Sequence, residues 1–172
     1  EALAHALGIG ADAPPGGVAE PDALQQRTIA RDRLETPTPR VALGQRLRRV
    51  ASAAIDVSDG LTGDLAHVLE QSGVGASIAG AALPCSTAMD EALAGAARAQ
   101  ALQWLIAGGD DYELCFTAAA SSRARVAAIG DELGLRVTRV GTITADRVFV
   151  VRDESGTPMP QLPRAFDHFA SS

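Results

Sequence analysis

Two aspartates and a serine, Asp56, Ser58 and Asp59, stand in the stretch AAIDVSDGLTGDLAHVL, where an apolar segment gives way to an amphipathic one. Residues two apart on an extended segment point to the same side, so Asp56 and Ser58 present their oxygen atoms together. The first turn of a helix offers free amide groups that favour phosphate, and carboxylates beside it suit the magnesium ion that accompanies a nucleotide. The pattern predicts a phosphate and metal site.

The same residues also fit an ordinary helix start. In that interpretation Ser58 or Asp59 caps the helix, Asp64 stabilises its first turn, and Asp56 only ends a strand. The local pattern alone leaves both interpretations open.

A second acidic turn, GGDDYEL at residues 108–114, again places carboxylates after glycines and before an apolar strand. Taken alone it is equally well explained as a solvated loop in which Asp111 accepts hydrogen bonds from nearby amides. Two such turns in one chain favour a site built from both.

Hydrophobic periodicity and turn residues predict the elements that would position these turns. The segment EALAHALGIG is typical of a helix end closed by Gly8 and Gly10, and with the following helix and a proline-rich spacer it forms an appendage, residues 1–40. The compact domain is predicted over residues 41–172, as an α+β fold in layers with a mixed β-sheet covered by helices. Helices are predicted at 21–35, 41–50, 61–73, 86–98, 99–107 and 122–134, and strands at 51–57, 75–84, 112–118, 136–144 and 147–153.

Composition excludes several classes of function. The 15 basic residues are all arginine, which rules out a P-loop lysine or a Schiff base from this chain, and the net charge of -6 argues against a nucleic-acid binder. No apolar run approaches the ~20 residues of a membrane span, and the first residues lack the pattern of a signal peptide, so we expect a cytoplasmic protein. Cys85 and Cys115 are isolated and are predicted to be two buried thiols.

Four motifs together resemble a known family: AAIDVSDGLTGDL, SGVGA, GGDDYELCFT and the terminal FDHFA. From about residue 36 onward the chain resembles the C-terminal part of the thiamine-monophosphate kinase family, within the aminoimidazole-ribonucleotide-synthetase-like superfamily. DVSDGL points to the superfamily, whereas GGDDYEL and the closing aromatic-Asp-His-Phe are more specific to these kinases.

The resemblance implies a homodimeric enzyme that uses ATP and magnesium (Mg2+) to phosphorylate thiamine monophosphate to thiamine diphosphate. By position in the motifs, Asp56 and Asp59 would bind magnesium, Ser58 would contact ATP, and Asp110 and Phe166 would contact the thiamine substrate. Asp110 departs from the family, in which many members have glutamate at this place. The resemblance implies no catalytic residue beyond these ligands.

The resemblance also implies that an ATP-binding N-terminal domain precedes this chain, with residues 1–40 as its last helices and linker, and that the chain alone has negligible kinase activity. Two alternatives remain at this point. One is another ATP-dependent member of the superfamily, acting on a ribonucleotide or on selenide. The other is a noncatalytic domain for assembly or ligand sensing, in which the acidic turns are structural.

Overall fold

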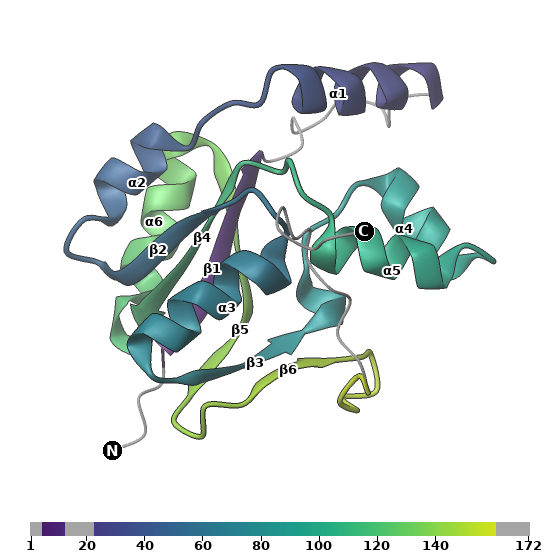
Figure 1. Ribbon diagram of the computed structural model, residues 1–172. Helices are drawn as coiled ribbons and strands as arrows, with labels where there is room; N and C mark the ends of the chain where they lie inside the picture. The colour runs from purple at the N-terminus through teal and green to yellow at the C-terminus, as the bar shows by residue number, and fades with distance from the viewer. Residues whose placement is uncertain (1–4, 13–22, 161–172) are drawn as a thin grey trace, which may run out of the picture.

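The computed structural model describes residues 5–12 and 23–160, in which helices and strands are interleaved (Figure 1). In chain order, the strands are β1 (His5–Asp12), β2 (Ala51–Val57), β3 (Gly75–Ala79), β4 (Glu113–Ala119), β5 (Leu135–Thr144) and β6 (Phe149–Arg152). The helices are α1 (Ala23–Glu35), α2 (Val41–Leu47), α3 (Leu61–Ser72), α4 (Thr87–Ala94), α5 (Arg98–Ala107) and α6 (Arg123–Leu133), with short 3-10 turns η1 (Gly80–Ala82) and η2 (Ala120–Ser122).

The strands form a six-stranded mixed sheet in the order β2-β4-β1-β5-β3-β6. Neighbouring strands are antiparallel except β3 and β6, which pair in parallel. Strand β4 pairs with β2 on one side and β1 on the other. The end of β2 and the start of β4 therefore lie next to each other, and these are the points where the two acidic turns join the sheet.

Helices cover both faces of the sheet and bury two apolar clusters. One cluster lies under α3 and α5 and includes Leu65 and Ile106, and the other lies under α2 and α6 and includes Leu43 and Ile129. Strand β4 contributes to both clusters, because alternate residues of a strand face opposite sides: Cys115 belongs to the first cluster and Phe116 to the second. Burying one such leucine contributes about 2 kcal/mol. The predicted fold class, a mixed sheet covered by helices, is confirmed.

The prediction of a helix end at EALAHALGIG is wrong, because residues 5–12 form strand β1. This strand lies between β4 and β5 and pairs with both. Alanine and leucine favour a helix locally, but pairing on two sides overrides that preference. The predicted division at residue 40 thus set apart a strand that belongs to the sheet.

The remaining predicted elements are confirmed to within a few residues, with one shortened. The expected strand at 75–84 ends at Ala79 and continues as the turn η1. The predicted glycine end of α3 is confirmed, since Gly73 has the left-handed conformation, with φ 65°. Within residues 5–12 and 23–160, no helix is long and apolar enough to cross a membrane.

The two cysteines differ from each other in burial. Cys115 is buried as predicted, whereas Cys85 is only partly buried, and both are free thiols. The thiol of Cys85 donates a hydrogen bond to Asp90 Oδ1 at 2.9 Å. Burial, together with this hydrogen bond, raises the pKa of Cys85 to about 11, so the sulfur stays protonated at neutral pH.

Candidate functional site

The first acidic turn connects β2 to α3 in three residues, Ser58, Asp59 and Gly60. Gly60 stands just before the helix with φ 106°, a conformation that side chains rarely adopt. A Cβ atom at this position would lie 2.7 Å from the backbone carbon of Ala107, at the end of α5. The turn therefore depends on a glycine that lets α3 begin against α5.

A buried carboxylate from inside α3 secures this turn. Asp64, whose exposed fraction is 5%, accepts hydrogen bonds through Oδ2 from the amide of Ser58 at 2.8 Å and from the amide of Asp59 at 3.0 Å. The helix-start interpretation is therefore wrong in its caps: the residue before the helix is Gly60, which has no side chain. The amides of Ser58 and Asp59, which precede the helix, are not free, because both are bonded to Asp64.

The second acidic turn is joined directly to the first through the backbone. The amide of Asp110 donates to the carbonyl of Ser58, and that of Tyr112 donates to the carbonyl of Val57, each at 2.8 Å. A Cβ on Gly109 would lie 2.5 Å from the Ser58 oxygen, so the contact requires glycine there. The two stretches, about fifty residues apart in sequence, form a single acidic site at one end of β2 and β4.

Positive backbone dihedrals accompany this junction. Asp110 has φ 66° and Tyr112 has φ 50°, whereas most residues other than glycine avoid positive values. Such conformations cost of order 1–3 kcal/mol each and persist where the surroundings fix them, often at functional sites. Here the surroundings are the two backbone hydrogen bonds to residues 57 and 58.

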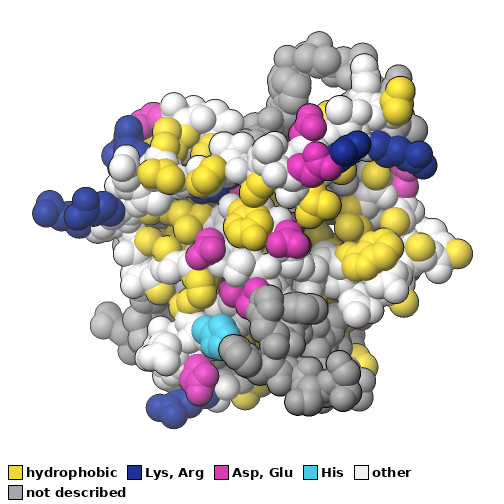
Figure 2. Space-filling model, turned by 45° about the horizontal axis from the view of Figure 1, so that its top comes forward, with side chains coloured by type: hydrophobic (Ala, Val, Ile, Leu, Met, Phe, Trp, Pro, Cys, Tyr) yellow, Lys and Arg dark blue, Asp and Glu magenta, His cyan; other side chains and the backbone are white. Residues whose placement is uncertain are grey.

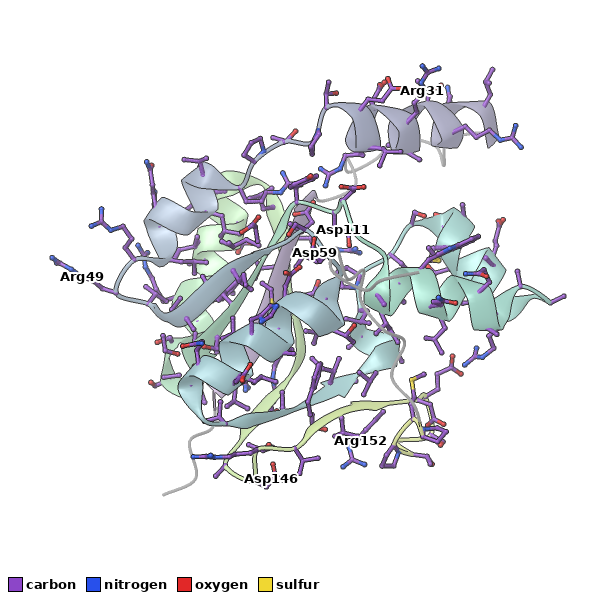
Figure 3. All side chains as sticks on the ribbon, viewed as in Figure 1. Arg31, Arg49, Asp59, Asp111, Asp146 and Arg152 are labelled. Atoms are coloured by element: carbon purple, nitrogen blue, oxygen red, sulfur yellow. The ribbon has the colours of Figure 1, made fainter. Side chains whose placement is uncertain are left out.

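The hydroxyl of Tyr112 bonds to a carboxylate of its own turn and is influenced by the charges of the first turn. Tyr112 Oη donates to Asp110 Oδ1 at 3.3 Å. This bond raises the pKa of Tyr112, and the charges of Asp110, Asp59 and Asp56 raise it further. Figure 3 labels Asp59 and Asp111 where the two turns meet, and Figure 2 shows acidic side chains gathered near the centre of that face, beside hydrophobic ones. The site is a region of concentrated negative charge.

Asp111 lies at the edge of a cavity of about 250 Å³ that adjoins the acidic turns. Desolvation and, after it, the charge of Glu113 raise the pKa of Asp111 to about 6, although the charge of Arg33 opposes the rise. Most residues that line the cavity are apolar: Val57, Leu61, Leu83, Pro84, Met89, Trp104 and Leu105 line it, together with Cys85, Ser86, Asp111 and Glu113.

Glu113 fastens the acidic turn to α1 and to the segment between α1 and α2. Its two carboxylate oxygens accept hydrogen bonds from Nε and Nη2 of Arg40, each at 2.7 Å, and Arg33 at the end of α1 forms a further ion pair with it. Glu113 and Arg40 are both buried, each with an exposed fraction of 9%. A buried pair with this forked geometry fixes direction as well as distance.

The donor chemistry of the site suits a hard divalent cation. Carboxylate oxygens are the ligands that magnesium takes from proteins, and magnesium usually completes its shell with water and nucleotide phosphates. Asp56 is exposed and Asp59 is half-buried, so solvent reaches both. No group of three or more His, Cys, Asp or Glu side chains among the described residues is placed to hold a metal by itself. The residues fit a magnesium ion that is shared with a phosphate ligand.

Of the predicted site residues, Asp56, Ser58, Asp59 and Asp110 are brought together in this way, and Phe166 lies outside the described residues. Sequence reasoning placed Asp64 in the first turn of the helix but missed its bonds to the amides of Ser58 and Asp59, and it missed the structural part played by Glu113. The place of Asp64 in the first turn of a helix was a usable signal for a bond back to preceding amides. No local signal could have paired Glu113 with Arg40, which lies 73 residues away.

Comparison with known families places the chain. Residues 9–154 match the family described as AIR synthase related protein, C-terminal domain. The chain belongs to this family. The match begins within β1, which agrees with the position of that strand inside the sheet.

Curated relatives resemble this chain over most of its length. The thiamine-monophosphate kinase of Salmonella typhimurium is 44% identical over 137 residues, which cover 78% of this chain and 41% of that protein. The thiamine-monophosphate kinase of Haemophilus influenzae is 36% identical over 160 residues, covering 87% and 44%. The chain thus spans less than half the length of these relatives.

Solved structures agree with the fold. The crystal structure of thiamine-monophosphate kinase from Stenotrophomonas maltophilia K279a superposes with a TM-score of 0.75 at 37% identity, over 87% of this chain and 50% of that one. AaThiL, complexed with AMPPCP and TMP, superposes with a TM-score of 0.69 over 97% of this chain and 52% of that one. At 22% identity the second likeness shows the fold alone. The resemblance to the C-terminal part of these kinases is confirmed.

Proposed function

We propose that this chain is the C-terminal portion of an ATP- and magnesium-dependent kinase that converts thiamine monophosphate to thiamine diphosphate. The observation that carries the proposal is the junction of the two acidic turns into one site, through hydrogen bonds from Asp110 to Ser58 and from Tyr112 to Val57. Its support is the 44% identity to a thiamine-monophosphate kinase over most of this chain.

Each predicted site residue has a part in this proposal. Asp56 and Asp59 bind magnesium, and the hydroxyl of Ser58 contacts ATP. Asp110 contacts the thiamine substrate, with a side chain one methylene shorter than the glutamate of many relatives, and Phe166 contributes an aromatic face to the same substrate. The negative charges of Asp110, Asp59 and Asp56, all of which raise the pKa of Tyr112, support a cation between the two turns.

The chemistry requires no general base from the protein. The acceptor is a phosphate monoester whose second pKa is near ~6, so it is largely dianionic at neutral pH. The obstacle is repulsion between two anions that must come into line. Catalysis of phosphoryl transfer therefore consists mainly of alignment and neutralisation of charge, for which bound magnesium supplies the positive charge and the acidic turns supply its ligands.

The remaining parts of the proposal concern the whole protein. We place the kinase in the cytoplasm as a homodimer, with the nucleotide site completed by an N-terminal domain. Because that domain supplies most of the nucleotide contacts in the proposal, the 172-residue chain alone is expected to have negligible kinase activity.

Replacing Asp59 with asparagine in the full-length protein tests the proposal. Asp59→Asn removes a metal ligand and is expected to lower kcat by at least ~10²-fold, as for other groups that act on transition-state charge, with little change in Tm. Steady-state kinetics and thermal unfolding measure the two effects.

The matched control is Asp131→Asn, which changes an exposed aspartate of α6 on the opposite face of the sheet and should leave both values unchanged. If Asp59→Asn lowers Tm but leaves the kinase rate intact, the acidic turns are structural and the noncatalytic alternative holds.

A further inference from the structure

The carboxylate of Asp64 has no part in the chemistry proposed above, yet it lies directly beneath the turn on which that chemistry depends. Its exposed fraction is 5%, and both of its described hydrogen bonds go to amides of the turn, those of Ser58 and Asp59. A side chain this buried is poorly accessible to ligands that arrive from solvent. Its contacts are with the peptide groups that carry the exposed side chains.

Residues 57–59 are held from two directions. The second acidic turn donates amides to the carbonyls of Val57 and Ser58, while Asp64 accepts the amides of Ser58 and Asp59. Four successive polar groups of the backbone are thereby bonded, at 2.8 to 3.0 Å. Hydrogen bonds to a charged carboxylate are about twice as strong as neutral ones, so the two bonds to Asp64 are the stronger two of these four.

The bonds to Asp64 also determine whether the turn favours a positive or a negative ligand. Unbonded amides at a helix start attract phosphate, but the amides of Ser58 and Asp59, just ahead of α3, already bond a carboxylate. The turn then offers carboxylate oxygens above and a negative charge below, which together favour a cation. A nucleotide phosphate would therefore meet this turn through the metal and not through the amides of Ser58 and Asp59.

We propose that Asp64 is a positioning residue for the magnesium-binding turn: it contacts neither metal nor substrate, and it fixes the Ser58–Asp59 peptides so that Asp59 faces the second acidic turn. The inference rests on the proposed function, in which Asp59 binds magnesium. Outer groups that orient metal ligands typically affect metal affinity by about 10- to 100-fold when removed.

The test compares Asp64→Ala with Asp64→Asn in the full-length protein. Asp64→Ala removes both bonds and is expected to raise at least about tenfold the magnesium concentration that gives half-maximal rate, with saturating magnesium recovering part of kcat. Asp64→Asn keeps a carbonyl oxygen that accepts the same amides, so it should change that concentration by less than about fivefold. Glu70→Ala, at an exposed acid on the same helix, is the matched control and should have no effect.

A second readout does not depend on turnover. Binding of Mn2+ in place of Mg2+, measured by electron paramagnetic resonance with ADP present, should weaken at least about tenfold in Asp64→Ala and less than about fivefold in Asp64→Asn. If Asp64→Ala does not fold, the test is the Mn2+ affinity of Asp64→Asn compared with that of Asp59→Asn.

Two results would overturn the inference. Unchanged metal dependence in a folded Asp64→Ala variant would show that the turn holds its shape without this residue. A loss in Asp64→Asn as large as that in Asp59→Asn would make Asp64 a metal ligand. Failure of the wild-type protein to form thiamine diphosphate would instead overturn the proposed function, and the positioning role with it.

Discussion

At the scale of single residues, burial divides the acidic side chains of this site into two groups with different roles. Asp64 and Glu113 are buried and bonded to backbone amides or arginines, so they hold the turns in place. Asp56 and Asp110 are exposed, and Asp59 is half-buried, so they remain accessible to ligands. The sequence predicted that acids gather here, but burial depends on tertiary packing, which a local pattern does not contain.

Asp111 gives a prediction about pH. Its folded-state pKa of about 6 lies above the ordinary value of 3.8, so the folded chain binds this proton more tightly than the unfolded chain. The contribution of Asp111 to stability therefore falls as pH rises through the window from about 4 to 6, and the deficit is complete above it. Asp111→Asn should stabilise the chain at about pH 7 but not at about pH 4.

We expect a gain on the order of 1 kcal/mol at about pH 7, discounted for solvent screening because the side chain is exposed. Urea unfolding of both proteins at the two pH values measures it. An equal difference between variant and wild type at the acidic and the neutral pH would contradict the raised pKa.

At the scale of elements, the site depends on how closely the start of α3 approaches the end of α5. Gly60 permits this approach and Gly109 permits the contact between the two turns, since a Cβ on either would meet backbone atoms at 2.7 Å or less. Predicting the helices and the strand from periodicity was sufficient to place both acidic turns at element ends. It could not indicate that the turns touch, because that contact is set by the pairing of β2 with β4.

Gly60→Ala tests this dependence. The variant combines a strained positive φ with a backbone clash, so it should lower the free energy of unfolding by about 3 kcal/mol or more. Gly134→Ala is the matched control, because Gly134 also has a positive φ, 64°, but no atom lies within 4 Å of the position that the alanine methyl group would take. It should cost only about 1 kcal/mol. Equal losses in urea unfolding would show that close approach to Ala107 is unimportant.

At the scale of the whole molecule, the mixed sheet and its two helical layers followed from the alternation of elements along the sequence, whereas the position of β1 did not. A short segment rich in alanine, leucine and glycine has no strand pattern of its own, and β4 and β5, its partners, lie more than 100 residues further along the chain. The same limit applies to Arg40 and Glu113. Local pattern therefore predicted the other elements, and long-range pairing determined that residues 5–12 form a strand and where it lies.

The central claim is that this domain serves a kinase that acts on thiamine monophosphate, and product formation by the full-length protein tests it most directly. Purified protein would be incubated with ATP, magnesium and either thiamine monophosphate or unphosphorylated thiamine, with EDTA and the 172-residue chain alone as controls. We expect thiamine diphosphate only from thiamine monophosphate, only with magnesium, and only from the full-length protein. Absence of thiamine diphosphate, or its formation by the 172-residue chain alone, would contradict the proposed function.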